Sequence, residues 1–199
     1  MKIQLIDVSA VLGLCAMVTL TVNVLLGMLL SCAYKTFDLW KKMPPQVKKL
    51  NILQLHNWTA YLALTLVVLH PLFLLLDKQS HFYIRDVFFP LGAPKQNYIV
   101  MLGSLSALAL IIVMITTQKA VKRHMSFRVW KNIHMISYFT ALLFIVHGLL
   151  MDPLLKDRTP DWFDGEKLLC ELCGLILIAA SYMRYKYHRG HQLKKAGTE

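Results

Sequence analysis

Five long apolar segments constrain the fold of this chain more than any other feature of its sequence. They lie at about residues 8–34, 52–76, 98–118, 130–151 and 168–185. Each segment approaches or exceeds the roughly 18 apolar residues that mark a membrane-spanning helix. None shows the alternation of apolar and polar residues that a barrel strand requires. The sequence therefore predicts an all-α fold, a polytopic membrane bundle of five transmembrane helices in a single domain that covers residues 1–199.

The composition agrees with a membrane protein. The 199 residues are 56% apolar and 17% charged, with a mean hydropathy of +0.49. Soluble domains are about half apolar and a quarter charged. The first apolar segment is longer than the roughly 7–15 residues of a secretory signal core, and no A-x-A-like cleavage site follows it. We therefore expect it to be a retained helix.

The net charge of +11 is distributed unevenly between successive loops. Fifteen of the 22 Lys and Arg residues lie in residues 33–50, in residues 119–131 and from Arg184 onward, and the other seven lie in the N-terminal tail and the two remaining loops. This alternation keeps step with five helices, so the positive-inside rule places the N-terminus outside and the C-terminus in the cytoplasm. Topology thus accounts for the charge, and we expect membrane lipid rather than nucleic acid as its surroundings.

Two of the predicted helices each carry a pair of histidines. His56 and His70 form an H-x13-H pattern in the second segment, and His134 and His147 form an H-x12-H pattern in the fourth. An ionisable side chain inside a membrane is costly, so each one is a functional hypothesis. At about 1.5 Å per residue the two patterns correspond to about 21 Å and about 19.5 Å of helix, which are nearly equal heights. One helix separates these two, so they run parallel, and the expected pairs are His56 with His134 on the cytoplasmic side and His70 with His147 outside.

Two imidazoles at each level suit the axial positions of haem iron. The sequence therefore predicts two stacked b-type haems, with the helices around them, through most of a hydrocarbon core about 30 Å thick. Zinc is excluded as a shared ion because ligands about 20 Å apart cannot reach one centre. A haem-free protein that uses the histidines to transport metal or protons stays an alternative. Ideal helix geometry also puts His134 and His147 about 140° apart around their helix, which is not one face.

Several further residues are candidates for supporting roles. Asn57, Thr59 and Ser137 lie near the histidines and are candidates for fixing the ring tautomers. Cys170 and Cys173 form a CELC motif at the start of the fifth helix, with a redox role or simple packing both open. Aromatic residues between the two levels can pack against haem or couple the pair: Trp58, Tyr61, Tyr138, Phe139 and Phe144. Basic residues of the second cytoplasmic loop can meet propionates or an electron donor, or simply set topology: Lys122, Arg123, Arg128 and Lys131.

The stretch TTQKAVKRHMSFRVWKNIHMISYFTALLFIVHG, Thr116 to Gly148, resembles the core of the ferric reductase-like transmembrane domain superfamily. That superfamily includes ferric reductases, NADPH oxidases and the haem subunit of the bacterial methionine sulfoxide reductase system. The resemblance runs from about Leu50 to Met151 and includes both histidine spacings. It implies a stand-alone bacterial form in the inner (plasma) membrane, in which all four histidines are axial ligands to the haem iron. Electrons would enter at the inner pair and leave at the outer pair.

The expected function is di-haem b transmembrane electron transfer from the cytoplasmic to the external side, as in ferric reductases. No G-x-G-x-x-G motif is present, so the donor is expected to be a separate cytoplasmic flavoprotein or a membrane quinol. Whether FMN or FAD binds at the cytoplasmic face stays open. The expected acceptor is a ferric chelate or a periplasmic redox protein. Leu74 stands where the oxidase branch has another histidine, and His56 supplies a ligand that the sulfoxide reductase subunits generally lack. Passing quinol or flavin electrons to a periplasmic reductase stays an alternative.

Overall fold

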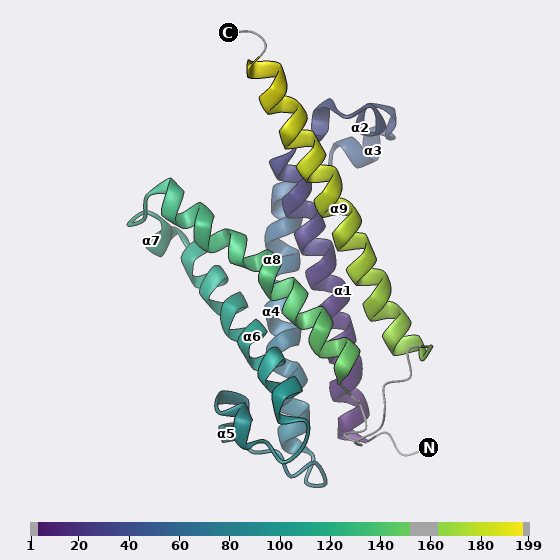
Figure 1. Ribbon diagram of the computed structural model, residues 1–199, viewed down its shortest axis with the longest axis vertical. Helices are drawn as coiled ribbons and strands as arrows, with labels where there is room; N and C mark the ends of the chain where they lie inside the picture. The colour runs from purple at the N-terminus through teal and green to yellow at the C-terminus, as the bar shows by residue number, and fades with distance from the viewer. Residues whose placement is uncertain (1–3, 152–162, 197–199) are drawn as a thin grey trace.

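The computed structural model describes residues 4–151 and 163–196, and these residues form helices and loops without any strand. Five helices are long (Figure 1): α1 (Leu5–Ser31), α4 (Ile52–Leu76), α6 (Asn97–Thr117), α8 (Phe127–Leu150) and α9 (Gly165–Ala196). The others are short connections: η1 (Tyr34–Thr36), α2 (Asp38–Lys42), α3 (Pro45–Lys48), α5 (Ile84–Phe88), η2 (Pro90–Gly92) and α7 (Lys119–Lys122).

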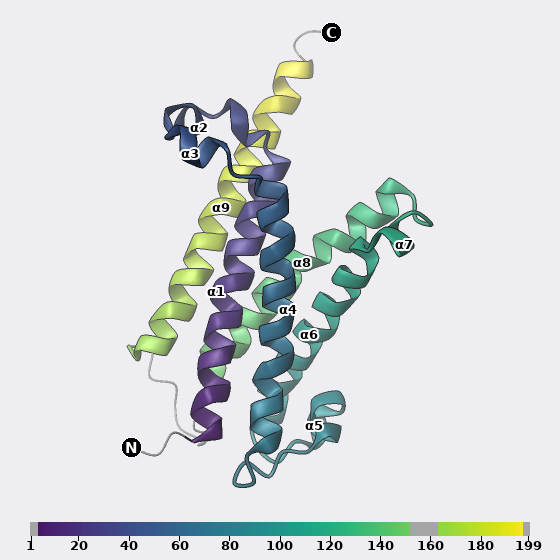
Figure 2. The same ribbon diagram turned by 180° about the vertical axis from the view of Figure 1, so that it is seen from behind.

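All five long helices contain a stretch long and apolar enough to cross a membrane. The described ends of the chain lie at opposite ends of the bundle (Figures 1 and 2), as an odd number of spans requires. The prediction of an all-α, multi-pass membrane bundle with five spans is confirmed. Every long helix begins within three residues of its predicted start.

The end predicted for the fifth helix is wrong, because α9 continues to Ala196 rather than stopping near residue 185. The apolar, membrane-length part of α9 ends at Gly190. The following residues are mostly Lys, His, Gln, Leu and Ala and include no proline, so nothing in them terminates a helix that has already formed. Loss of hydropathy thus marks the end of the apolar segment rather than the end of the helix.

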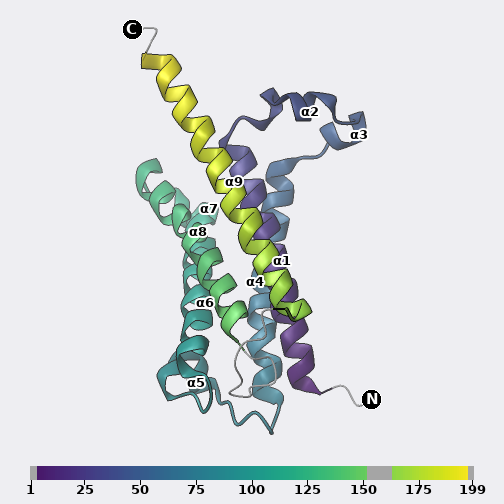
Figure 3. The same cartoon turned by 45° about the vertical axis from the view of Figure 1, so that its right-hand side comes forward.

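The bundle is organised as two packed pairs with a fifth helix across them. Helix α1 packs along α4, α6 packs along α8, and α9 covers α1 and α8 (Figure 3). Toward the end where the C-terminus lies, α7 and the first turns of α8 lean away from α1 and α4, which is visible in Figures 1 and 2. The histidine-bearing helices α4 and α8 belong to different pairs, so the space between the pairs is where their rings meet.

Small and polar residues let α6 and α8 approach closely. Ser106 Oγ donates a hydrogen bond of 3.0 Å to the backbone oxygen of Thr140, and both side chains are fully buried. Contacts of this kind replace the hydrophobic effect, which does not drive helices together in lipid. The same contact sets the register of the two antiparallel helices, because Ser106 and Thr140 are opposite each other.

The outer end of α8 is tied to α9. Lys167 is buried and its Nζ donates to the carbonyl oxygens of Gly148 (3.0 Å) and Met151, which a C-terminal helix turn leaves without partners. Cys170 is fully buried, and its sulfur lies 3.1 Å from the position that a Cβ on Gly148 would take. Cys170 and Cys173 are both free thiols in the packed core. Their burial favours the packing use over the redox use.

Candidate functional site

The four intramembrane histidines meet as two facing pairs. The ring centroids of His56 and His134 are 6.2 Å apart, with the ring planes at 74°. Those of His70 and His147 are 6.3 Å apart, with the planes at 79°. These are the pairs that the equal spacings predicted. Because α8 is inclined to α4 (Figure 1), the face of α8 turned toward α4 changes along its length, and this inclination absorbs the angular offset of an ideal helix.

Three of the histidine rings donate a hydrogen bond to a backbone carbonyl of a neighbouring helix. The Nδ1 atom of His70 lies 2.7 Å from the oxygen of Ser9, and that of His56 lies 3.0 Å from the oxygen of Asn23. The Nδ1 atom of His147 lies 2.8 Å from the oxygen of Ile99. A carbonyl oxygen only accepts, so the ring proton is on Nδ1 in each case. A neutral imidazole then has its lone pair on Nε2, which is the ligating form.

Each of these three rings also lies against a glycine one turn beyond the accepting carbonyl. A Cβ at Gly13 would lie 3.0 Å from the ring of His70, and one at Gly27 would lie 3.2 Å from that of His56. At Gly103 it would lie 2.8 Å from the ring of His147. We call this arrangement of carbonyl and glycine at positions i and i+4 the carbonyl–glycine clamp, and it occurs three times: Ser9/Gly13, Asn23/Gly27 and Ile99/Gly103.

At the two clamps on α1, a side chain of α1 also donates a hydrogen bond to the backbone of α4. Ser9 Oγ donates to the backbone oxygen of His70 at 2.7 Å, and Asn23 Nδ2 donates to that of His56 at 2.6 Å. Both Ser9 and Asn23 are buried. Their separation along α1 equals that of the two histidines along α4, so α1 repeats one contact at both levels.

The three side chains named as candidates for fixing the ring tautomers are not the partners of the rings. The polar side chain that lies against a ring is Ser9, whose Oγ is 3.2 Å from His70 Nδ1. Among the hydrogen bonds of the described residues, none joins Asn57, Thr59 or Ser137 to a histidine ring, and Thr59 instead accepts one from Asn23 at 2.8 Å. The partners are main-chain atoms, which carry no residue-type signal. The spacing did hold a signal, since Gly13 and Gly27 have the same separation in the sequence as the histidines that they contact.

His134 is held differently from the other three. Its Nδ1 is buried and has no hydrogen-bond partner among the residues that the structure describes. Its ring stacks on Trp130, with centroids 5.2 Å apart and planes 17° from parallel. Lys122 Nζ in turn lies 3.8 Å from the centroid of the Trp130 ring. An aromatic stack therefore supports this ring in place of a carbonyl–glycine clamp.

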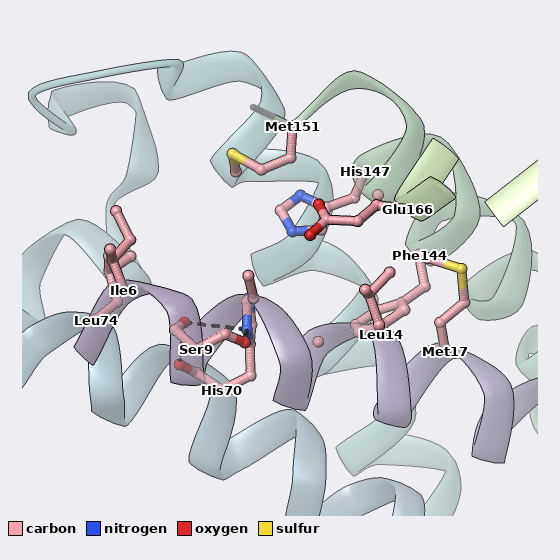
Figure 4. A pocket seen from close by; sticks show the side chains of 13 residues that line it. Ile6, Ser9, Leu14, Met17, His70, Leu74, Phe144, His147, Met151 and Glu166 are labelled. Atoms are coloured by element: carbon pink, nitrogen blue, oxygen red, sulfur yellow. Dashed lines mark hydrogen bonds between the residues drawn. The ribbon is translucent and has the colours of Figure 1, made fainter. Parts of the chain in front are cut away.

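A pocket beside the outer pair shows the surroundings of His70 and His147 (Figure 4). Its wall is mostly apolar, with Leu14 and Met17 on α1, Leu74 on α4 and Phe144 on α8. Ser9 and His70 face each other across the contact of α1 with α4. The wall leaves space next to the rings, and Glu166 at the start of α9 adds one carboxylate to it.

The remaining predicted residues are mostly at the surface. Trp58, Tyr61 and Phe139 are exposed on the outside of the bundle, where lipid would surround them. Tyr138 is half-buried against the core, and Phe144 is buried, with its ring centroid 6.1 Å from that of His147. Glu171 lines a separate groove of about 680 Å³ between α8 and α9, to which none of the four histidines contributes.

The facing pairs have the spacing that two axial ligands of one metal ion require. With about 2 Å per metal–nitrogen bond and about 1.1 Å from each ring centroid to its nitrogen, the centroids would be about 6.2 Å apart. In the described part of the chain, no three His, Cys, Asp or Glu side chains gather into a metal site. Two imidazoles alone suit a metal that brings its other ligands with it, as iron in a porphyrin does. The residues present therefore fit haem.

Comparison with known proteins identifies the family of the chain. Residues 12–145, which include three of the four histidines, match the family described as ferric reductase like transmembrane component. The comparison with curated proteins found no match. The matched region covers well over half of the chain, and it contains the H-x13-H pair His56 and His70 together with His134, whereas His147 lies two residues beyond it. The protein thus belongs to the ferric reductase-like transmembrane component family.

Proposed function

We propose that the protein carries single electrons across a membrane through two b-type haems, one between each pair of histidines. The observation that supports this most directly is the pairing itself: two sets of facing imidazoles, with centroids 6.2 and 6.3 Å apart, on helices long enough to span a bilayer. Membership of the ferric reductase-like family supports the same function. His56 and His134 would hold the inner haem, and His70 and His147 the outer one.

The role of the protein is to orient and enclose these ligands. When bound, haem supplies the reversible one-electron chemistry of its iron. The clamps keep the proton of His56, His70 and His147 on Nδ1 and so leave Nε2 as the nitrogen that can bind a metal. Because the accepting groups belong to the main chain of long helices, they are already fixed in place, and little conformational entropy is lost when they orient the rings.

The core between the two levels is dry. Ala63 and Val67 of α4, and Ala141 and Phe144 of α8, lie in sequence between the inner and outer histidines and are all buried. Water is therefore excluded from the path between the pairs, and a low-dielectric interior limits the reorganisation that accompanies each electron. Leucine lines the pocket at position 74, where the oxidase branch has a histidine, and this supports delivery of electrons to an external acceptor over reduction of oxygen in the pocket.

The direction and the partners are part of the proposal. Basic residues gather around α7 and the start of α8, with Lys122, Arg123 and Arg128 exposed, and the positive-inside rule assigns this end to the cytoplasm. Electrons would enter here from a separate flavoprotein carrying FMN or FAD, or from a membrane quinol. They would leave at the outer pair to a ferric chelate or a periplasmic redox protein.

Reconstitution into sealed vesicles tests this function. With ferricyanide enclosed and dithionite added outside, we expect the haem-loaded protein to bleach the enclosed ferricyanide many times faster than vesicles without protein. Rates no faster than those of empty vesicles would contradict transmembrane electron transfer. Repeating the assay with enclosed ferric citrate separates the acceptors, because a direct ferric reductase reduces the chelate and a subunit that serves a periplasmic reductase does not.

A further inference from the structure

The register of α6 and α8 explains why His134 has no clamp. In this antiparallel pair Ile99 is opposite His147 and Ser106 is opposite Thr140, and both contacts follow one register. Continuing that register along the helices brings Ile112 opposite His134. The position one turn beyond it, where a clamp requires glycine, is occupied by Thr116.

The carbonyl groups that follow Ile112 along α6 are engaged by side chains of α6 itself. Thr116 Oγ1 donates to the oxygen of Val113 at 2.9 Å, and Thr117 Oγ1 donates to that of Met114 at 2.7 Å. Gln118 Nε2 donates to the same Met114 oxygen at 3.1 Å. The level of His134 therefore lacks the glycine of a clamp, and side chains of α6 occupy the next two carbonyl oxygens along that helix. The Nδ1 of His134 is buried without a partner among the described residues.

A histidine that lacks this hydrogen bond is a weaker metal ligand. Donation from Nδ1–H to an acceptor raises the basicity of the ligating nitrogen and fixes the ring. His56, His70 and His147 have that support. His134 has only the stack on Trp130, which Lys122 covers through a cation–π contact. The inner pair thus combines one clamped ligand with one that a neighbouring side chain positions.

We propose that His134 is an exchangeable axial ligand positioned by Trp130, and that the reduced inner haem binds a diatomic π-acceptor, such as carbon monoxide or nitric oxide, in its place. This inference rests on the proposed function. In the exchange with carbon monoxide, the bond from iron to His134 Nε2 breaks and a bond from iron to carbon forms. The iron stays Fe(II), and the imidazole leaves neutral, without gaining or losing a proton. The outer pair, with both rings clamped, keeps its two ligands.

Carbon monoxide binding to the dithionite-reduced, two-haem protein tests the inference. We expect one carbon monoxide for every two haems. We also expect a binding rate that reaches a plateau as its concentration rises, because departure of His134 limits the exchange. In His134→Ala, retention of the inner haem by His56 would make the rate rise in proportion to concentration with no plateau.

Three variants test whether the stack on Trp130 sets the plateau rate. Trp130→Leu removes the aromatic partner of His134, and we expect the plateau rate to rise about tenfold, the factor that an aromatic stack of this kind contributes. Trp130→Phe retains part of the stack and should give a smaller rise. Phe144→Leu removes the aromatic neighbour of His147, 6.1 Å away, and should leave the plateau unchanged. If Trp130→Leu binds only one haem, the loss of the inner haem supports the role of Trp130 in positioning His134. The plateau rate is then compared between Trp130→Phe and the wild type.

Failure of this inference is distinguishable from failure of the proposed function. A wild-type protein with two haems that binds no carbon monoxide, or binds two, would overturn the inference and leave the electron-transfer function intact. Equal plateau rates in Trp130→Leu and Phe144→Leu would also overturn it. Purified protein without any haem would overturn the proposed function itself.

Discussion

Replacing His147 with alanine is expected to lower the haem content from two to one per chain and to stop electron transfer across the membrane. His147 is buried, faces His70 with ring centroids 6.3 Å apart and is the clamped histidine of α8, which we propose as a ligand of the outer haem. Without it the outer iron keeps one protein ligand and the electron path ends at the inner pair. Haem extraction against protein concentration measures the first effect, and the vesicle assay with enclosed ferricyanide measures the second.

The control for this change is a histidine outside both pairs. His188 is exposed on the part of α9 that approaches the C-terminus, and His188→Ala should keep two haems and the wild-type rate. His56→Ala should remove the inner haem in the same way that His147→Ala removes the outer one. A His147→Ala protein that keeps two haems with unchanged spectra would show that His147 is not a ligand.

Gly103→Ala is expected to weaken binding of the outer haem without touching either of its ligands. The new Cβ would lie 2.8 Å from Cε1 and 3.0 Å from Nδ1 of His147, distances at which the ring must move. Overpacking of this kind costs about 1–3 kcal/mol, which corresponds to a loss of haem affinity of roughly 5- to 150-fold. Titration of the haem-depleted protein with haem, followed by the absorbance of the outer site, measures this loss.

Gly174→Ala provides the matched change on another transmembrane helix. Its Cβ would meet Ile145 Cγ2 at 3.6 Å, an ordinary contact, so haem affinity should not change. Both substitutions replace glycine within a helix by a better helix former, so any difference between them comes from the ring of His147. Equal haem affinities in Gly103→Ala and Gly174→Ala would show that the clamp does not hold the ligand.

The five spans and the pairing of the histidines were predictable from the sequence, because both follow from patterns within individual apolar segments. Apolar length gives the five spans, and equal spacing on parallel helices gives the partners of His56 and His70. The angular offset between His134 and His147 on an ideal helix disagreed with their pairing to His56 and His70. It disappears in the structure because α8 is inclined to α4 (Figure 1), and the angle between two helices is set by the packing of the bundle rather than by the sequence of either helix alone.

The supporting contacts were not predictable from residue type alone. Polar side chains near the histidines were expected to orient the rings, but the acceptors are carbonyls of α1 and α6, which every residue possesses. The one signal in the sequence was that Gly13 and Gly27 have the same separation as His56 and His70, which indicated that α1 contacts α4 in the same way at both levels. The absence of a clamp at His134 depends on which residue of α6 lies opposite it on α8. The sequence of either helix alone does not give this register.

The number of haems bound by the purified wild-type chain tests the central claim most directly. Two facing pairs of imidazoles at two depths predict two b-type haems per chain, both six-coordinate in the oxidised protein. Pyridine haemochrome absorbance, divided by the protein concentration from amino-acid analysis, gives the number. A value of two is the predicted result, and a value of one or zero would contradict the assignment of all four histidines as ligands.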